Sequence, residues 1–314
     1  MSTLVKEKPQ TKSKPSFFKR FNKSKYLLIL FLPTLIYYLV FKYAPMWGVS
    51  IAFLDYSPFR GFAKSEFIGF EHFNTFFSTA SATRTVTNSI ILGLQMIVFG
   101  FPAPIIFALV LNEVKGMQKK KFVQTVSYMP HFLSSVVVAG MLQEFLSPIN
   151  GIVNQIIVAL GGTAINFFQS AAWFRPMFVA SDIWQQMGWG AIIYMAALTN
   201  IDPALYEAAS IDGANRWQQM LNITLPSIAP TIITMLLLRI GSILTVNLEK
   251  ALLLQNSATY STSDIIDTFV YRVGIVNGNL SYATAVGLFN SVVCFVLLIF
   301  ANTVARRFSD SSLF

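Results

Sequence analysis

The chain has 314 residues, of which 54% are hydrophobic and only 12% are charged. A typical soluble domain carries about 25% charged residues, and a soluble protein of this length could not hide so much apolar surface. The composition therefore excludes a soluble globular protein and predicts an integral membrane protein. The net charge of +9 does not indicate a nucleic-acid partner, because eight of the 23 Lys and Arg residues precede Tyr26 and four more lie within 113–121.

Six segments are apolar enough and long enough to cross the hydrocarbon core as helices, which takes about 20 residues each. They lie near 26–46, 86–112, 122–146, 174–200, 227–248 and 281–304. We therefore expect an all-α membrane protein with about six transmembrane helices. Its predicted parts are a cytoplasmic basic amphipathic tail (1–25), a first transmembrane helix (26–46), an outside segment (47–85), a core (86–305) with a cytoplasmic loop (201–226), and a cytoplasmic tail (306–314).

The distribution of Lys and Arg predicts the orientation, because these residues accumulate in short cytoplasmic loops. With the N-terminus inside, the cytoplasmic segments hold 15 of the 23 Lys and Arg residues, whereas 147–172 holds none. We expect a multi-pass protein of the cell membrane with both termini in the cytoplasm. The first span lacks a small-residue cleavage site and is predicted to be an uncleaved anchor. The stretch SFFKRFNKSK before it suits an anionic cytoplasmic bilayer surface.

The fourth predicted span carries a polar helix face. Its members recur at i, i+3, i+4 and i+7, and they are Asp182, Gln185, Gln186 and Trp189. Polar residues inside spans are costly and usually face a cavity or a neighbouring subunit. Amide and carboxylate groups beside an indole ring suit a sugar, because the polar groups bind hydroxyls and the ring stacks on C–H faces. We predict that this face lines a substrate pathway.

A polar stretch, EAASIDGANRWQQMLNITLPSIAP, separates the fourth and fifth spans over residues 207–230. Asp202 is a predicted cap for a first short helix, Gly213 ends that helix, and Asn215 is a predicted cap for a second one. Two prolines, Pro226 and Pro230, then precede the next span. We expect a short cytoplasmic helix–turn–helix whose alanines and Trp217 offer a compact knob for a groove on another protein.

The fifth predicted span places Arg239 near mid-bilayer, with Ser242 on the same face. An unpaired Arg at that depth in the bilayer carries a large free-energy cost. Arg239 could pair with Asp182 or with a neighbouring subunit, or it could meet a substrate carboxylate or hydroxyl groups. Asp182 is offset from Arg239 by about 9 Å along the helix axes, whereas Gln186 and Trp189 are closer to the depth of Arg239 in the membrane. We predict that Arg239 and Ser242 belong to the pathway and that the transported sugar is acidic.

Several chemical signatures are missing from the sequence. No G-x-x-x-x-G-K-[ST] phosphate loop occurs, so ATP hydrolysis would need a separate subunit. The two histidines, His72 and His131, and the single cysteine, Cys294, are too far apart for metal spacing. His131 is predicted to be a structural histidine and Cys294 a small apolar core residue. We expect neither an enzyme nor a metal site.

The polar stretch resembles the signature loop of the membrane subunits of binding-protein-dependent ABC importers. The matching residues are Glu207, Ala208, Ala209, Asp212, Gly213, Ala214, Ile223, Leu225 and Pro226. One departure is Met220, where carbohydrate-importing members often have Phe; Met also fills an apolar groove. The segments 33–53, 127–141 and 147–154 are similar to the subgroup that imports oligosaccharides and polysaccharide fragments.

The resemblance implies a type I importer permease fold and a coupling helix seated in a cleft of an ATPase. Glu207, Ala208, Ala209, Asp212, Gly213, Ala214, Trp217, Met220 and Pro226 would be the coupling residues. It also implies a second permease subunit, two copies of an ATP-binding subunit that uses ATP and Mg, and an extracellular solute-binding protein. No cofactor is expected in this chain. The alternatives are a permease for a different solute or an ion-coupled secondary sugar transporter; a membrane-embedded enzyme is disfavoured because no catalytic cluster is present.

Overall fold

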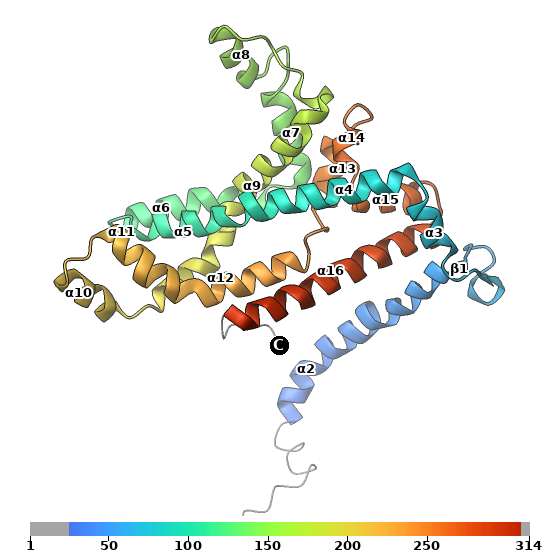
Figure 1. Ribbon diagram of the computed structural model, residues 1–314, viewed down its shortest axis with the longest axis horizontal. Helices are drawn as coiled ribbons and strands as arrows, with labels where there is room; N and C mark the ends of the chain where they lie inside the picture. The colour runs from blue at the N-terminus through green and yellow to red at the C-terminus, as the bar shows by residue number, and fades with distance from the viewer. Residues whose placement is uncertain (1–24, 309–314) are drawn as a thin grey trace, which may run out of the picture. The chain divides into compact units, whose positions relative to one another are not determined.

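The computed structural model describes residues 25–308, so the basic tail predicted before Lys25 and residues 309–314 lie outside the described residues. The described chain is built from helices and connecting loops with one short hairpin of two strands (Figure 1). Its described residues divide into two compact units, one that ends at Ser50 and one that begins at Ile51.

A long apolar helical segment makes up the described part of the first unit and ends three residues beyond it. It begins as α2 (Lys25–Tyr38) and continues through a π-helical turn, η1 (Leu39–Tyr43), into a 3-10 stretch, η2 (Ala44–Phe53). The 29 residues Lys25–Phe53 are long and apolar enough to cross a membrane. Between Tyr26 and Phe41 no charged residue interrupts the helix. A helix that is apolar all round suits a lipid environment.

The second unit opens with a short hairpin. Strand β1 (Leu54–Asp55) pairs antiparallel with β2 (Glu66–Phe67), with Leu54 opposite Phe67 and Asp55 opposite Glu66. A 3-10 turn, η3 (Phe62–Lys64), lies in the connecting loop, and helix α3 (Glu71–Phe77) follows. The Arg60 guanidinium pairs with the Asp55 carboxylate at 2.7 Å across the loop. This hairpin occupies much of the predicted outside segment.

The second predicted span is one long helical segment with an irregular centre. It runs through α4 (Ala80–Gln95), the π-helical turn η4 (Met96–Gly100) and α5 (Pro102–Asn112). Within the turn, the Phe101 N–H bonds the Met96 carbonyl at 2.9 Å, five residues back. Pro102 follows immediately and has no N–H to continue the regular ladder. Pro102 and Pro104 therefore lie directly after the irregular backbone, and the helix continues through them as α5.

The third predicted span, 122–146, is not one straight helix. Helix α6 (Met117–Tyr128) and the 3-10 turn η5 (Met129–Phe132) are followed by a break, and α7 (Ser135–Phe145) leaves at an angle of 99°. Pro130 lacks a backbone donor, and the Ser134 hydroxyl accepts the Val137 N–H at 3.3 Å as a helix cap. A new helix therefore starts at this point. Helix α8 (Ile152–Ala159) and the turn η6 (Phe167–Gln169) follow.

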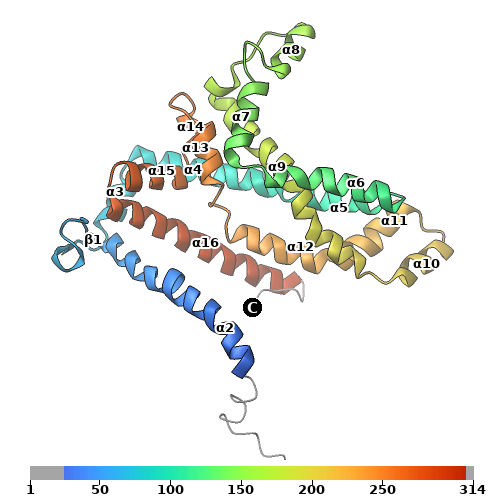
Figure 2. The same ribbon diagram turned by 180° about the vertical axis from the view of Figure 1, so that it is seen from behind.

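Helix α9 (Ala171–Thr199), of 29 residues, holds the second unit together. It packs against α5, α6 and α12 and so brings together segments far apart in sequence (Figures 1 and 2). Its contact with α6 is close, because a side chain at Gly188 would collide with the Ser127 carbonyl oxygen. Glycine at this position allows the two backbones to approach.

The predicted fifth span is shifted towards the N-terminus. Helices α10 (Pro203–Ile211) and α11 (Arg216–Gln219) flank a turn, and α11 continues without interruption through the π-helical turn η7 (Met220–Thr224) into α12 (Leu225–Ile240). The continuous segment Arg216–Ile240 is long and apolar enough to cross a membrane, whereas 241–247 is not helical. The second short helix of the predicted helix–turn–helix is thus the first part of the span itself.

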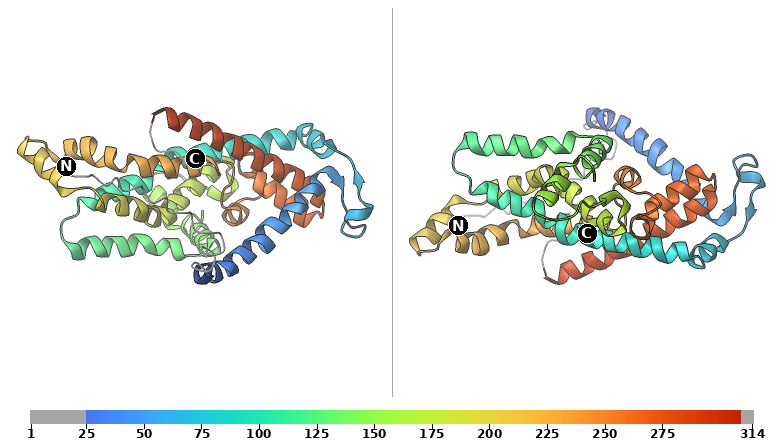
Figure 3. Two further views of the ribbon diagram at one scale, coloured as in Figure 1. Left: turned by 90° about the horizontal axis from the view of Figure 1, so that it is seen from below. Right: turned by 90° about the horizontal axis from the view of Figure 1, so that it is seen from above.

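Short helices lead into the last span. They are α13 (Leu248–Leu254), α14 (Tyr260–Ser263), α15 (Ile266–Tyr271) and the π-helical turn η8 (Arg272–Val276), followed by α16 (Leu280–Phe308). Helix α16 packs beside α12, α15 and α3. The loop that carries α10 lies at one end of the long helices of this unit, and α3 lies at the other end (Figure 3).

The all-α membrane architecture predicted from the sequence is confirmed, and most residues of each of the six predicted segments are helical. Four helical segments within residues 25–308 are long and apolar enough to cross a membrane, or five if the bent α6–α7 pair counts as one span. Helix α9 has sufficient length but is less apolar, because its polar face carries the residues singled out above.

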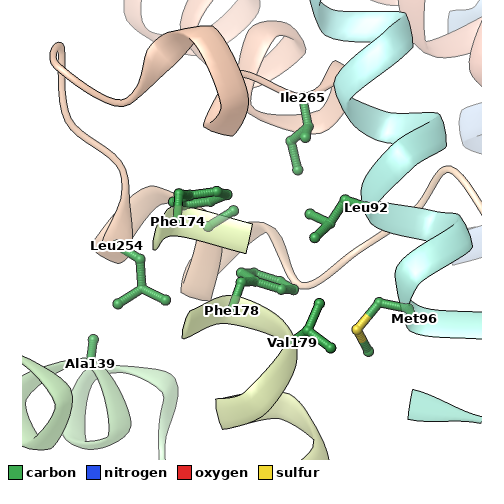
Figure 4. Close-up of a cluster of buried hydrophobic side chains, with 9 residues drawn as sticks. Leu92, Met96, Ala139, Phe174, Phe178, Val179, Leu254 and Ile265 are labelled. Atoms are coloured by element: carbon green, nitrogen blue, oxygen red, sulfur yellow. The ribbon is translucent and has the colours of Figure 1, made fainter. Parts of the chain in front are cut away.

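An apolar cluster joins α4, α7, α9 and α13 in the centre of the second unit (Figure 4). Its buried members are Leu92, Met96, Ala139, Phe174, Phe178, Val179, Ala251, Leu254 and Ile265. Next to Ile265 of this cluster, the fully buried Asp264 carboxylate accepts from Arg84 at 2.8 Å and from Arg272 at 2.9 Å. This ion cluster ties α4 to the segment between α14 and η8.

Candidate functional site

A cavity of about 520 Å³ opens between α9, the irregular centre of the second span, and the C-terminal half of α12. Its volume falls in the range of small-molecule sites, about 300–1,000 Å³. Four of the six predicted pathway residues line it: Asp182, Gln186, Arg239 and Ser242. Met96 and Phe178 belong both to its lining and to the apolar cluster, so that cluster closes one side of the cavity.

Asp182 and Arg239 do not pair with each other, although such a pair was one of the alternatives left open by the sequence. Asp182 instead accepts from the Lys250 ammonium group, with an Nζ–Oδ1 distance of 3.0 Å. The Lys250 side chain is fully buried and lies over the Phe178 ring at 5.7 Å from its centroid. Lys250 comes from α13, just beyond the end of the predicted fifth span, and was not among the predicted pathway residues. The one local signal is a lysine inside the apolar run LEKALLL.

Arg239 is half-buried and has no hydrogen-bond or ion-pair partner for its guanidinium group among residues 25–308. Ser242, one turn on, donates its hydroxyl to the Leu238 and Arg239 carbonyls at 3.3 Å. The cavity therefore holds one carboxylate that is already paired with a buried ammonium group, and one guanidinium group that is unpaired within the described chain.

The other two predicted pathway residues, Gln185 and Trp189, do not line this cavity. Gln185 is buried and donates its side-chain amide to the Leu133 carbonyl at 2.8 Å. The Trp189 ring stacks on His131, with centroids 4.4 Å apart and planes inclined by 2°. The polar face of α9 is split because the broken third span packs against one side of it. His131 has a structural contact, as the sequence suggested.

Local hydrogen bonds and one glycine fix the turn between α10 and α11. The Asp202 carboxylate caps α10 through the Ala204 N–H at 2.9 Å. Gly213 adopts φ +80°, a left-handed conformation that glycine reaches without strain. Asn215 and Gln218 form a reciprocal capping box at 2.9 Å and 2.8 Å. The two predicted caps, Asp202 and Asn215, are therefore present, and α10 ends just before Gly213 as predicted.

Side chains of this region enclose a hollow of about 850 Å³. Its lining includes predicted coupling residues, among them Glu207, Ala214 and Met220. The Tyr206 hydroxyl and the Thr224 hydroxyl lie 2.9 Å apart across its base. Arg216 pairs at 3.0 Å with Glu113, which lies in the loop between α5 and α6. The segments 113–116 and 201–226 therefore lie at the same end of the unit.

The tip of α10 and the start of α11 expose large apolar side chains. Ile211 is 87% exposed and Trp217 is 65% exposed. Residues of this kind are typical of a surface that another protein covers. Trp217 was predicted from the sequence; Ile211 was not, because an isoleucine next to Asp212 cannot be distinguished from a core residue without knowing which side of α10 is buried. Among the described residues, no group of three His, Cys, Asp or Glu side chains could hold a metal.

Comparison with known proteins gives consistent results. Residues 100–310 match the family described as the binding-protein-dependent transport system inner membrane component. The chain is 46% identical to Protein LplB of Bacillus subtilis (strain 168), over 95% of this chain and 94% of that protein. It is 43% identical to the polygalacturonan/rhamnogalacturonan transport system permease protein YteP of the same organism, over 93% of this chain and 91% of that protein.

Two solved structures share the fold. One is a bacterial alginate ABC transporter in complex with an alginate pentasaccharide-bound periplasmic protein; its matching chain has a TM-score of 0.86 and 41% identity, and the match covers 95% of this chain and 99% of that one. The other is a bacterial ABC transporter involved in the import of the acidic polysaccharide alginate, with a TM-score of 0.86 and 42% identity over 93% and 99% of the two chains.

Proposed function

The chain belongs to the family of binding-protein-dependent transport system inner membrane components, and from that premise we propose that it passes an acidic oligosaccharide from an external binding protein to the cytoplasm. Membership of this family makes the chain the transport component of an ABC importer and not an enzyme. It is a multi-pass membrane protein, and ATP is hydrolysed by a separate subunit.

The partners follow from the same premise. The chain works with an extracellular solute-binding protein, a second permease subunit and two copies of an ATP-binding subunit. The α10–α11 loop is the surface for the ATP-binding subunit, through the exposed Ile211 and Trp217 and the hollow beside Glu207. Closure of the ATP-binding subunits moves this loop, and the helices then alternate access to the cavity.

The acidic character of the substrate rests on one observation. Arg239 lines the cavity without a partner among residues 25–308, while Lys250 already satisfies Asp182. This pairing disfavours the rival explanation in which Arg239 neutralises Asp182. A guanidinium group presents a planar fork of donors that matches a carboxylate. The names of similar proteins, which include polygalacturonan and the acidic polysaccharide alginate, support the same class of substrate.

The test is uptake by the complete transporter, reconstituted with its binding protein, of an acidic oligosaccharide and a neutral one of equal length. Arg239→Gln should lower uptake of the acidic sugar about tenfold or more relative to the neutral one, because it removes a charge-assisted hydrogen bond. Arg239→Lys keeps the positive charge but loses the planar pair of donors, so its uptake of the acidic sugar should lie between that of the wild type and that of Arg239→Gln. Equal loss of both sugars in Arg239→Gln would show that Arg239 has a structural role and that the cavity does not select acidic sugars.

The orientation of the chain is part of the proposal. The N-terminus, the loop 113–121, the α10–α11 loop and the C-terminus are placed on the cytoplasmic side, in agreement with the distribution of Lys and Arg. The Arg216–Glu113 contact supports a common side for the two internal loops.

A further inference from the structure

One side chain outside the cavity is bonded directly to a cavity residue. His131 does not line the cavity, but its Nδ1 lies 2.8 Å from Oε1 of Gln186, which does. We propose that His131 is a positioning residue: it holds the Gln186 amide so that the NH₂ group faces the cavity and donates to a carboxylate of the sugar. This inference rests on the proposed function and deepens it.

The chemistry of the amide supports this arrangement. A glutamine side chain offers one acceptor oxygen and two N–H donors. When His131 carries a proton on Nδ1, that N–H donates to the Gln186 oxygen, and the amide oxygen is then engaged away from the cavity. Nε2 of Gln186 has no hydrogen-bond partner within residues 25–308. The donor end of the amide is therefore the end left for a ligand.

The His131 ring cannot turn freely to release the amide. It stacks on Trp189 at a centroid distance of 4.4 Å with nearly parallel planes. Phe132 packs edge-on against both rings, at 5.4 Å from His131 and 5.6 Å from Trp189. A second contact between the same elements, from Gln185 to the Leu133 carbonyl at 2.8 Å, holds the η5 turn against α9. The imidazole is thus held by one ring stacked on its face and by a second ring packed edge-on.

The bend in the third span makes this contact available. His131 lies on the 3-10 turn η5, next to the 99° break between α6 and α7. Trp189 and Gln186 lie one turn apart on α9, so the imidazole stacks on one and bonds the other. On the predicted polar face of α9, Gln185 and Trp189 therefore bind the η5 region, while Asp182 and Gln186 line the cavity.

Two side chains of the cavity lining have nitrogen donors without a partner within residues 25–308, and these donors suit a carboxylate. Arg239 contributes an unpaired guanidinium group, and Gln186 contributes an NH₂ group. The Asp182 carboxylate, which could otherwise accept from sugar hydroxyls, is held by Lys250. A carboxylate has acceptor oxygens only and can accept from both donors. A neutral sugar hydroxyl gains less from this pair, so the contribution of His131 is selective for acidic sugars.

The experiment separates the hydrogen bond of His131 from its ring. His131→Phe keeps an aromatic ring to stack on Trp189 and loses the donor to Gln186. His131→Asn loses the ring and keeps a side-chain N–H near the position of Nδ1. Each variant is compared in the complete reconstituted transporter for uptake of a galacturonic acid oligosaccharide and a neutral galactose oligosaccharide of equal length, with binding protein in excess.

We expect His131→Phe to lower uptake of the acidic sugar about fivefold relative to the neutral one, and His131→Asn to restore most of it. In a Gln186→Leu background, His131→Phe should cause no further selective loss, because the group that it positions is gone. Equal loss of both sugars in His131→Phe, or an additional selective loss in the Gln186→Leu background, would overturn the positioning role.

Arg239→Gln, measured in parallel, distinguishes the two proposals. If Arg239→Gln is selective for the acidic sugar and His131→Phe is not, the positioning role fails and the proposed function stands. If neither variant is selective, the acidic substrate is refuted as well.

Discussion

At the scale of single residues, the pair formed by Lys250 and Asp182 shows how a membrane protein keeps charge in its interior. Removing one partner of a buried pair leaves an uncompensated charge, which typically costs roughly 3 kcal/mol or more. Replacing both partners with uncharged groups avoids that penalty. Lys250 is fully buried and Asp182 is only 17% exposed, so removing either partner of this pair should carry that penalty.

We therefore expect Lys250→Met to lower the free energy of unfolding by roughly 3 kcal/mol. The double variant Lys250→Met with Asp182→Asn should recover most of this loss. Thermal unfolding of the detergent-solubilised protein measures both. A double variant as unstable as Lys250→Met alone would mean that the lysine contributes through packing and not through its charge.

Asp267, on α15, carries a half-buried carboxyl group outside the predicted spans. Burial raises its pKa, and the hydrogen bond from the Val246 N–H at 3.2 Å opposes this only in part. The folded protein therefore holds this proton more tightly than the unfolded chain does. The stability contributed by Asp267 is complete at low pH and is lost as the pH rises through the raised pKa.

Asp267→Asn should consequently stabilise the protein at neutral pH, by roughly 1 kcal/mol, and flatten the pH dependence of unfolding above pH 4. The Asn290 amide donates to the Asp267 carboxylate at 3.5 Å in the wild type, and its own side-chain oxygen is buried and unpartnered among the described residues, so an Asn290 amide that turns over can accept from the new side chain. Melting temperatures from pH 4 to pH 8 test this. A variant that is less stable than the wild type at pH 7 would contradict the direction of the pKa shift.

At the scale of structural elements, the α10–α11 turn combines a rigid backbone with exposed apolar side chains. Gly213 has φ +80°, which proline cannot adopt because its ring fixes φ near −65°. Glu207 lines the hollow on the other side of the turn. The turn can therefore be disturbed without touching the cavity or the apolar cluster.

Gly213→Pro and Glu207→Lys should leave the protein in the membrane and abolish transport and binding-protein-stimulated ATPase activity. Gly61→Pro is a matched control, because Gly61 also has a positive φ, +68°, but lies in the hairpin loop near β1. It should keep the ATPase activity. Purified complexes in which Gly213→Pro and Glu207→Lys still hydrolyse ATP and still transport would show that this loop does not transmit the motion.

At the scale of the whole molecule, the orientation in the membrane can be tested independently of transport. Cysteines introduced at Ser13 and Ser309 should be protected from a membrane-impermeant thiol reagent in intact cells, whereas a cysteine at Thr163 should be labelled. The native Cys294 is buried and should contribute little background. Labelling of the Ser13 variant from outside would reverse the assigned topology.

The sequence alone was sufficient for the features that depend on local chemistry. Apolar length predicts membrane helices because the hydrocarbon core requires it, and the helix caps at Asp202 and Asn215 follow from residues a few positions apart. The signature around Glu207 and Gly213 indicates the family in the same way, through residue types in a fixed order. None of these inferences requires knowledge of which helices are neighbours.

The tertiary structure decided the features that depend on contacts between distant segments. Lys250 and Asp182 are 68 residues apart, and His131 and Gln186 are 55 apart, so no helical periodicity relates them. The sequence places the polar residues of α9 on one continuous helix face. In the structure, Gln185 and Trp189 contact the bent third span, whereas Asp182 and Gln186 line the cavity. Which partner a charged side chain selects depends on the helix packed against it, because the Coulomb interaction acts through space and not along the chain.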